Sequence, residues 1–123
     1  MVSKKVGMIA TNQLDLNSRN VQRSTGHYVT RTFATKDRDY HKPASTFPQT
    51  DTKIVSCCLS GGLYKTGLLR DIGLIQIEYR QYNSCSEFGL RALLKHWEVQ
   101  FAEKAIMSHL GPNPLMNGGG KSR

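Results

Sequence analysis

The stretch IGLIQIEYRQYNSCSEFGLRALLKHWEVQF, residues 72–101, carries the strongest structural signal in this sequence. Its first part, residues 72–82, alternates between two faces in the period of a β-strand. One face carries Ile75, Ile77 and Tyr79, and the other carries Gln76, Glu78 and Arg80. Period two with one apolar face is typical of an antiparallel strand that covers a core on one side.

The second part of the stretch has the period of an α-helix. Apolar residues recur at helical spacing, at Leu90, Leu93, Leu94, Trp97, Phe101 and Ala105. Ser84 and Glu87 fit a capping box at the start, and Gly111, Pro112 and Pro114 are residues that end helices. The pattern predicts a helix over residues 84–110, regular from about Ser86 to about His109, with Trp97 and Phe101 on its buried face.

Upstream, shorter strands are predicted. Tyr28–Ala34 is rich in β-branched and aromatic residues, and TKDRD (35–39) is a turn that leads into a returning strand at Tyr40–Phe47. Pro43 cannot donate a hydrogen bond to a sheet, so it predicts an edge or a bulge there. Lys53–Leu59 is a third strand candidate, and Val6–Ala10 is a short alternating patch.

These elements predict one α+β domain over residues 1–123: an antiparallel β-sheet followed by a C-terminal α-helix packed on one sheet face. Its expected parts are N-terminal strands and loops at 1–26, the sheet at 27–82, the helix at 84–110 and a mobile tail at 111–123. A chain this short buries a modest core, so its stability is expected to depend on a partner subunit.

The charge of the chain points to an anionic partner. Seventeen Lys and Arg stand against nine Asp and Glu, a net charge of +8, which favours nucleic acid, anionic lipid or an acidic protein. The sequence shows no apolar stretch of about 20 residues and no secretory signal, so a cytoplasmic protein is the expectation.

No catalytic or cofactor motif is recognisable, and an enzyme is not expected. The four histidines, at positions 27, 41, 96 and 109, form no HExxH or His-carboxylate pattern, and the glycine-rich SGG and GGGK lack the strand and helix of a phosphate loop. Cys57, Cys58 and Cys85 have no zinc-ligand spacing. Three reduced thiols are the simpler interpretation; the alternative is that Cys57 or Cys58 links two subunits.

Basic and aromatic residues of the strand region are candidates for RNA contact. The basic ones are Arg31, Lys36, Arg38, Lys42, Lys53, Arg70 and Arg80, and the tyrosines are Tyr28, Tyr40, Tyr79 and Tyr82. Lys and Arg contact phosphates, short polar side chains reach base edges, and tyrosines stack on bases. An ordinary solvated sheet face is the competing interpretation.

Residues 72–97, together with the upstream YVTRTFATKDRDYHKPASTFP (28–48), resemble the coat proteins of single-stranded RNA bacteriophages, the levivirus-type coats. The likeness covers roughly residues 28–110 and rests on a strand, a short Ser/Asn joint with an acid, and a helix, in that order. The sequence departs from the family at Pro43, in its N-terminal part and in the short 53–69 region.

The resemblance implies an interlocked homodimer with one continuous sheet and the helices on one face, assembled into an icosahedral shell around genomic RNA. Assembly in the bacterial cytoplasm and location in the virion are then expected. A stem-loop bound on the sheet face would also repress translation. The implied RNA-side residues are Thr30, Thr32, Lys42, Arg70, Gln76 and Arg80, and the implied dimer core is Leu90, Leu94, Trp97 and Phe101.

The resemblance also places Cys57 and Cys58 in a loop where some family members form disulfides between subunits. The sequence leaves two alternatives to a coat protein: a small non-capsid RNA- or DNA-binding regulator, and a small enzyme such as a nuclease. The regulator predicts binding without shells, whereas the enzyme predicts turnover that one His or carboxylate substitution removes.

Overall fold

A ten-residue strand, β1 (Val6–Asp15), lies at the centre of this computed structural model. The structure describes residues 5–18, 20–32, 34–44, 52–57, 61–76 and 81–109, with the backbone alone at 81–83. The other elements, in chain order, are β2 (Gln22–Ser24), β3 (His27–Val29), β4 (Thr35–Asp37), β5 (Leu63–Tyr64), α1 (Thr66–Ile72), α2 (Gln81–Leu94) and β6 (Glu98–His109). The predicted α+β class is confirmed.

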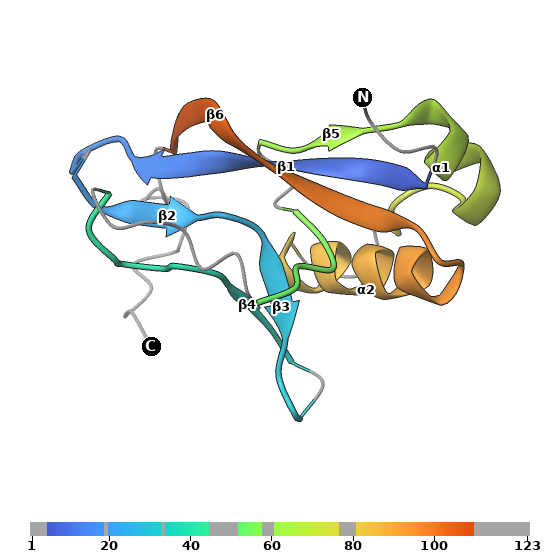
Figure 1. The fold of residues 1–123 in the computed structure, drawn as a ribbon. Coiled ribbons are helices and arrows are strands. Elements are labelled where there is room, and N and C mark those ends of the chain that lie inside the picture. Colours follow the sequence, from blue (N-terminus) through green and yellow to red (C-terminus); the bar gives the residue numbers. More distant parts are fainter. Residues whose placement is uncertain are drawn as a thin grey trace.

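Three strands pair with β1. β5 and β2 are antiparallel to it, through Met8↔Tyr64 and Gln13↔Ser24 respectively. β6 runs parallel along its whole length, and its register jumps between Ala102 and Ile106. Figure 1 shows β6 crossing β1. The sheet therefore contains a parallel pair that the sequence patterns did not predict.

The core lies between this sheet and the two helices. Its buried residues come from β1, the 54–57 segment and both helices: Met8, Ala10, Ile54, Cys57, Leu68, Phe88 and Ala92. On α2, Cys85, Phe88 and Ala92 form the buried stripe at helical spacing. None of the described helices is long and apolar enough to cross a membrane.

The predicted helix over 84–110 is wrong in both its bounds and its buried face. α2 begins at Gln81, so Ser84 lies inside it, and it ends at Leu94. His96 has φ of 64°, and the Trp97 and His96 N–H groups donate to the carbonyls of Ala92 and Leu93. This is a Schellman ending, which turns the chain into β6.

β6 replaces the second half of the predicted helix because its apolar residues also suit a strand. Val99 and Phe101 are half-buried and pack against the core, whereas Glu98 and Gln100 are exposed. This period of two fits a strand with one face inward. The apolar spacings of three and four in residues 90–101 favoured a helix. A local pattern cannot show that residues 98–109 pair with β1, because β1 lies far away in the sequence.

The strand predicted over 72–82 is also not formed where the structure describes it. Ile72 ends α1, where Gly73 adopts φ of 86° and donates its N–H to Leu69 O. Residues 73–76 have no regular structure, 77–80 lie outside the described residues, and α2 starts at Gln81. The helical contacts of Leu68, Leu69 and Ile72 with the core compete with extension here.

The predicted central hairpin exists in a shifted form. β3 and β4 pair through His27↔Asp37, Tyr28↔Lys36 and Val29↔Thr35, so the reversal is at 30–34 rather than at TKDRD. Residues 38–41 form a turn instead of strand, Pro43 makes an isolated bridge to Val21, and Ser56 makes one to His27. The expected strands Tyr40–Phe47 and Lys53–Leu59 are therefore wrong over their described parts, 40–44 and 53–57.

Candidate nucleic-acid interface

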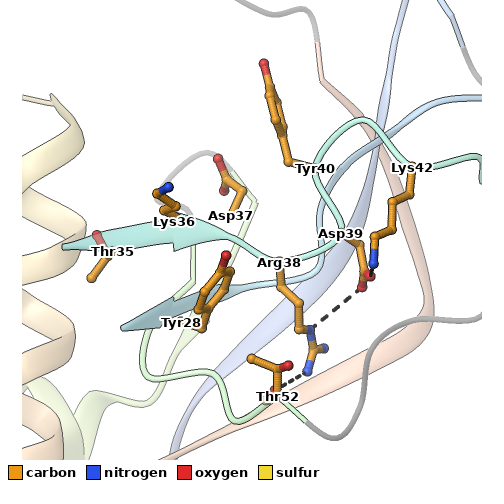
Figure 2. A pocket seen from close by; sticks show the side chains of 9 residues that line it. All are labelled: Tyr28, Thr35, Lys36, Asp37, Arg38, Asp39, Tyr40, Lys42 and Thr52. Carbon is orange, nitrogen blue, oxygen red and sulfur yellow. Dashed lines mark hydrogen bonds and ion pairs between the residues drawn. The ribbon is translucent and has the colours of Figure 1, made fainter. Parts of the chain in front are cut away.

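A pocket of about 600 Å³ opens beside the β3–β4 hairpin. Its walls come from β3, β4, the turn that follows β4, and the 52–57 segment (Figure 2). The lining residues are Tyr28, Thr35, Lys36, Asp37, Arg38, Asp39, Tyr40, Lys42 and Thr52. This volume is within the range of small-molecule and nucleotide sites.

The turn after β4 has an unusual backbone that sets the position of Tyr40. Asp39 and His41 have φ of 61° and 64°, a region that Asp, Asn and His enter more readily than other non-glycine residues. His41 N–H donates to Gln22 O, and Gln22 N–H donates to Lys42 O, which joins the turn to β2. Tyr40 consequently lies outward, 47% exposed, with its ring stacked on that of His41.

Beneath the turn, a buried polar network replaces an apolar core. Arg38 Nε donates to Thr25 Oγ1 over 2.8 Å, and its other nitrogens donate to the carbonyls of Thr25 and Thr52. The Thr25 hydroxyl in turn donates to Asp39 Oδ2 over 2.8 Å. Figure 2 shows the Arg38 side chain between Asp39 and Thr52.

The positive charge of Arg38 interacts with groups in the protein interior. Its side chain is buried, its Nε lies 3.9 Å from Asp39 Oδ2, and its guanidinium carbon lies 5.0 Å from the centre of the Phe101 ring. Burial lowers the pKa of Arg38, while the Asp39 carboxylate opposes the shift. Arg38 therefore holds the pocket floor in place and is not available to a phosphate at the surface.

Asp37, which lines the pocket, belongs to a hydrogen-bonded Ser-His-Asp group whose other two members lie behind it. Asp37 Oδ1 lies 3.0 Å from His27 Nε2, and Ser56 Oγ lies 2.9 Å from His27 Nδ1. Burial acts to raise the pKa of Asp37, but the hydrogen bond and charge of His27, helped by Ser24 and Arg23, outweigh burial and lower it. Ser56 is only 1% exposed, so its hydroxyl is not accessible to a substrate. We therefore interpret the Ser56, His27 and Asp37 side chains as a structural hydrogen-bonded group.

The rim of the pocket combines positive charge with aromatic surface. Lys36 is exposed, and Lys42 Nζ lies 3.5 Å from Asp39 Oδ1 while its side chain stays open to solvent. The Arg23 guanidinium carbon lies 5.6 Å from the centre of the Tyr40 ring. Cations beside a tyrosine face are suited to a nucleotide, because the phosphate and the base can be bound together.

Of the predicted RNA-side residues, Lys42 lines this pocket and Thr30 and Thr32 lie in the hairpin turn, where their hydroxyls are 3.0 Å apart. Arg70 is on α1 and Gln76 follows it, both exposed. Figure 1 places α1 beside the start of β1, away from the hairpin tip. The coat-protein resemblance implies that Arg70, Gln76 and Arg80 share one face of the last long strand. Arg70 and Gln76 do not lie on such a strand, and Arg80 lies outside the described residues.

The predicted dimer-core residues do not share one helix face either. Leu90 and Leu94 are on α2, where Leu94 is 79% exposed. Trp97 follows the helix, packs against the core and donates its Nε1–H to Asp71 Oδ2 over 2.8 Å. Phe101 is on β6 and also packs against the core of its own chain.

The predicted disulfide between subunits stays a prediction. Cys57 is a buried core residue and Cys85 is a buried thiol on α2. Cys58 lies outside the described residues. A bridge through Cys57 would require the core around it to open.

Sequence reasoning missed Asp37, Asp39 and Thr52 as pocket residues, although it singled out Tyr28, Tyr40, Lys36 and Lys42. The available signal was KDRDYHK (36–42), where charges of both signs alternate around a tyrosine. Within the described ranges, no group of three or more His, Cys, Asp or Glu side chains is placed to hold a metal ion. No protein-family model matches the chain, and no curated protein matches its sequence.

Proposed function

We propose that this protein binds single-stranded RNA at the hairpin pocket, as a binding protein rather than an enzyme. The observation that carries the proposal is the exposed Tyr40 ring, which lines a pocket of about 600 Å³ together with Lys36 and Lys42. The net charge of +8 supports it, because RNA is a polyanion.

The two kinds of rim residue have different roles in this proposal. Base stacking on an exposed aromatic ring contributes about 1–3 kcal/mol per base and tolerates different sequences. Lys36 and Lys42 contact phosphates, and each such contact adds to the salt dependence of binding. Arg38 acts indirectly, by supporting the turn that carries Tyr40.

Fluorescence anisotropy with a labelled single-stranded RNA tests this proposal. Tyr40→Ala is expected to weaken binding about tenfold, and Tyr40→Phe to retain it, because the ring and not the hydroxyl stacks. Lys36→Gln should reduce the slope of log affinity against log salt by roughly 0.7, the value for one phosphate on a single strand.

The matched control is Lys95→Gln, an exposed lysine after α2 that makes the same charge change away from the pocket. If Lys36→Gln and Lys95→Gln lower affinity equally, binding is a general charge effect and the pocket is not the site. Single-stranded DNA of the same sequence, measured in parallel, shows whether RNA is preferred.

We further propose, as a second candidate, that the bound RNA is a genome that the protein packages as a phage coat subunit. The observation that favours self-assembly is β6, which among the described strands pairs with β1 alone. Its residues 103–108 are all exposed, with Ile106 at 63%. Long apolar edge strands are templates for pairing with another chain, so two copies could join into one sheet.

Expression in bacteria, size exclusion and negative-stain imaging distinguish this candidate from a regulator. Uniform round particles rich in nucleic acid would establish the coat function and the virion as its location. A small species that binds RNA without forming shells would instead make the protein a non-capsid RNA-binding module.

A further inference from the structure

The pocket contains an exposed carboxylate that has no role in phosphate binding or in base stacking. Two carboxylates are among its nine lining residues. The Asp39 side chain is only 3% exposed and interacts with Thr25, Arg38 and Lys42. The Asp37 side chain is 39% exposed, and Figure 2 shows it at the pocket between Lys36 and Tyr40.

Asp37 is held in one orientation from behind. His27 Nε2 lies 3.0 Å from its Oδ1, and His27 is itself fixed by Ser56 Oγ at 2.9 Å, a side chain in the buried interior. A carboxylate has about four lone-pair positions, so the hydrogen bonds from His27 and Ser24 leave acceptor capacity for a ligand. The hydrogen bond and charge of His27 lower the pKa of Asp37 below its ordinary value of 3.8, which favours the ionised form.

Fixed, ionised acceptors of this kind discriminate between bases. Guanine presents two adjacent donors on its Watson–Crick edge, N1–H and the N2 amino group, which match the two oxygens of a carboxylate. Cytosine and adenine place a ring nitrogen acceptor beside their amino group, and uracil places carbonyl oxygens on both sides of its single N–H. These acceptors would face the negative charge of Asp37.

We propose that Asp37 selects guanine: an unpaired guanine enters the pocket, donates N1–H and N2–H to the Asp37 carboxylate, and lies against Tyr40. The inference rests on the proposed RNA binding at this site and adds the base that is preferred. Lys36 and Lys42 contact the phosphates on either side of that nucleotide. Single-stranded RNA is required, because in a duplex the same edge of guanine is paired with cytosine.

The decisive experiment uses the unmodified protein and a series of labelled oligouridines that differ in one central nucleotide: guanosine, inosine, adenosine, cytidine or uridine. Inosine retains N1–H and lacks the N2 amino group, so it removes one of the two donors. Guanosine is expected to bind about tenfold more tightly than uridine, with inosine in between, since a good bidentate contact discriminates by about that factor or more.

The variant Asp37→Asn tests the residue. An amide has one acceptor oxygen, so the guanosine preference should fall to within about twofold of uridine while binding to oligouridine persists. Glu103→Gln, an exposed carboxylate on β6, makes the same charge change and should keep the preference. Circular dichroism of both variants checks that the fold is retained. The comparison of guanosine, inosine and uridine uses the unmodified protein, so it does not depend on whether a variant folds.

The possible outcomes distinguish a failure of guanine selection from a failure of RNA binding itself. Equal affinity for all five oligonucleotides, with Tyr40→Ala still weakening binding, would overturn guanine selection and leave RNA binding in place. A preference for guanosine that survives in a folded Asp37→Asn would show that another group reads the base. Absence of binding to every oligonucleotide would overturn the proposed function itself.

Discussion

The sheet–helix side and the hairpin side of this molecule are held together by different interactions. On the first side, Met8, Leu68 and Phe88 are fully buried and pack on other apolar groups. On the second, the buried groups are polar: Thr25, Arg38 and Asp39 are joined by hydrogen bonds and charge. Apolar packing tolerates exchange of similar shapes, whereas a polar network loses stability when one partner is removed.

The largest effect is expected in the apolar core. Phe88→Ala should lower the free energy of unfolding by about 3–5 kcal/mol, the usual range for truncation of a buried phenylalanine. The ring is fully buried and meets Tyr64 edge-on with centroids 5.7 Å apart. Urea unfolding measures the loss, and Phe88→Leu should cost much less. A midpoint equal to that of the wild type would show that α2 buries another face.

The next effect is expected in the polar network. Arg38→Gln should cost about 3 kcal/mol, because it leaves the buried Asp39 carboxylate without its guanidinium partner. Arg70→Gln makes the same change on the exposed face of α1 and should alter stability by less than about 0.5 kcal/mol. Equal losses for both variants in urea unfolding would show that the Arg38 network contributes nothing specific.

A smaller effect depends on pH through Asp37. Its pKa is lowered from the ordinary value of 3.8, so the ionised form stabilises the folded state. The stabilisation is complete above the unfolded-state pKa and is lost as pH falls through the lower folded-state pKa. The stability difference between wild type and Asp37→Asn should therefore narrow as pH drops below about 4 in an unfolding series. A difference that stays constant from pH 7 to pH 3 would exclude this contribution.

The smallest effect on a single chain is expected at Leu94. The side chain is 79% exposed, so Leu94→Ser should change the unfolding free energy of the monomer by less than about 0.5 kcal/mol. If Leu94 packs on a second copy, as the coat-protein proposal expects, sedimentation should show weaker dimers. A large loss of stability that does not depend on protein concentration would instead place Leu94 in the core of its own chain.

Local pattern predicted a helix in the right region and misjudged which face it buries. Leucines at 90, 93 and 94 and aromatic residues at 97 and 101 suggested one long stripe, whereas Cys85, Phe88 and Ala92 face the core. Apolar residues occupy more than one side of this segment, so periodicity cannot choose between them. The turn that ends α2 has His96 in a left-handed backbone conformation, which glycine usually occupies. Because residue 96 is a histidine, the sequence gives no glycine signal for a helix end at this point.

The exposed residues of the candidate site could be predicted from the sequence, whereas its buried residues could not. Tyr28, Tyr40, Lys36 and Lys42 could be proposed from residue type alone, because RNA is recognised by cations and aromatic rings. Arg38 has the same chemistry in sequence, yet it is buried against Asp39 and Thr25. That difference arises from a contact across 13 positions of the chain, between Thr25 and Arg38.

By itself, the sequence determined the α+β class, the net positive charge, a strand at the start of the chain and the basic, tyrosine-containing segment around residue 40. These follow from composition and short-range periodicity, which act on neighbouring residues. Only the tertiary structure decided that residues 98–109 are a strand parallel to β1, that Arg38 faces inward, and that Asp37, His27 and Ser56 meet. Such outcomes depend on segments far apart in the chain, where burial and pairing outweigh local preference.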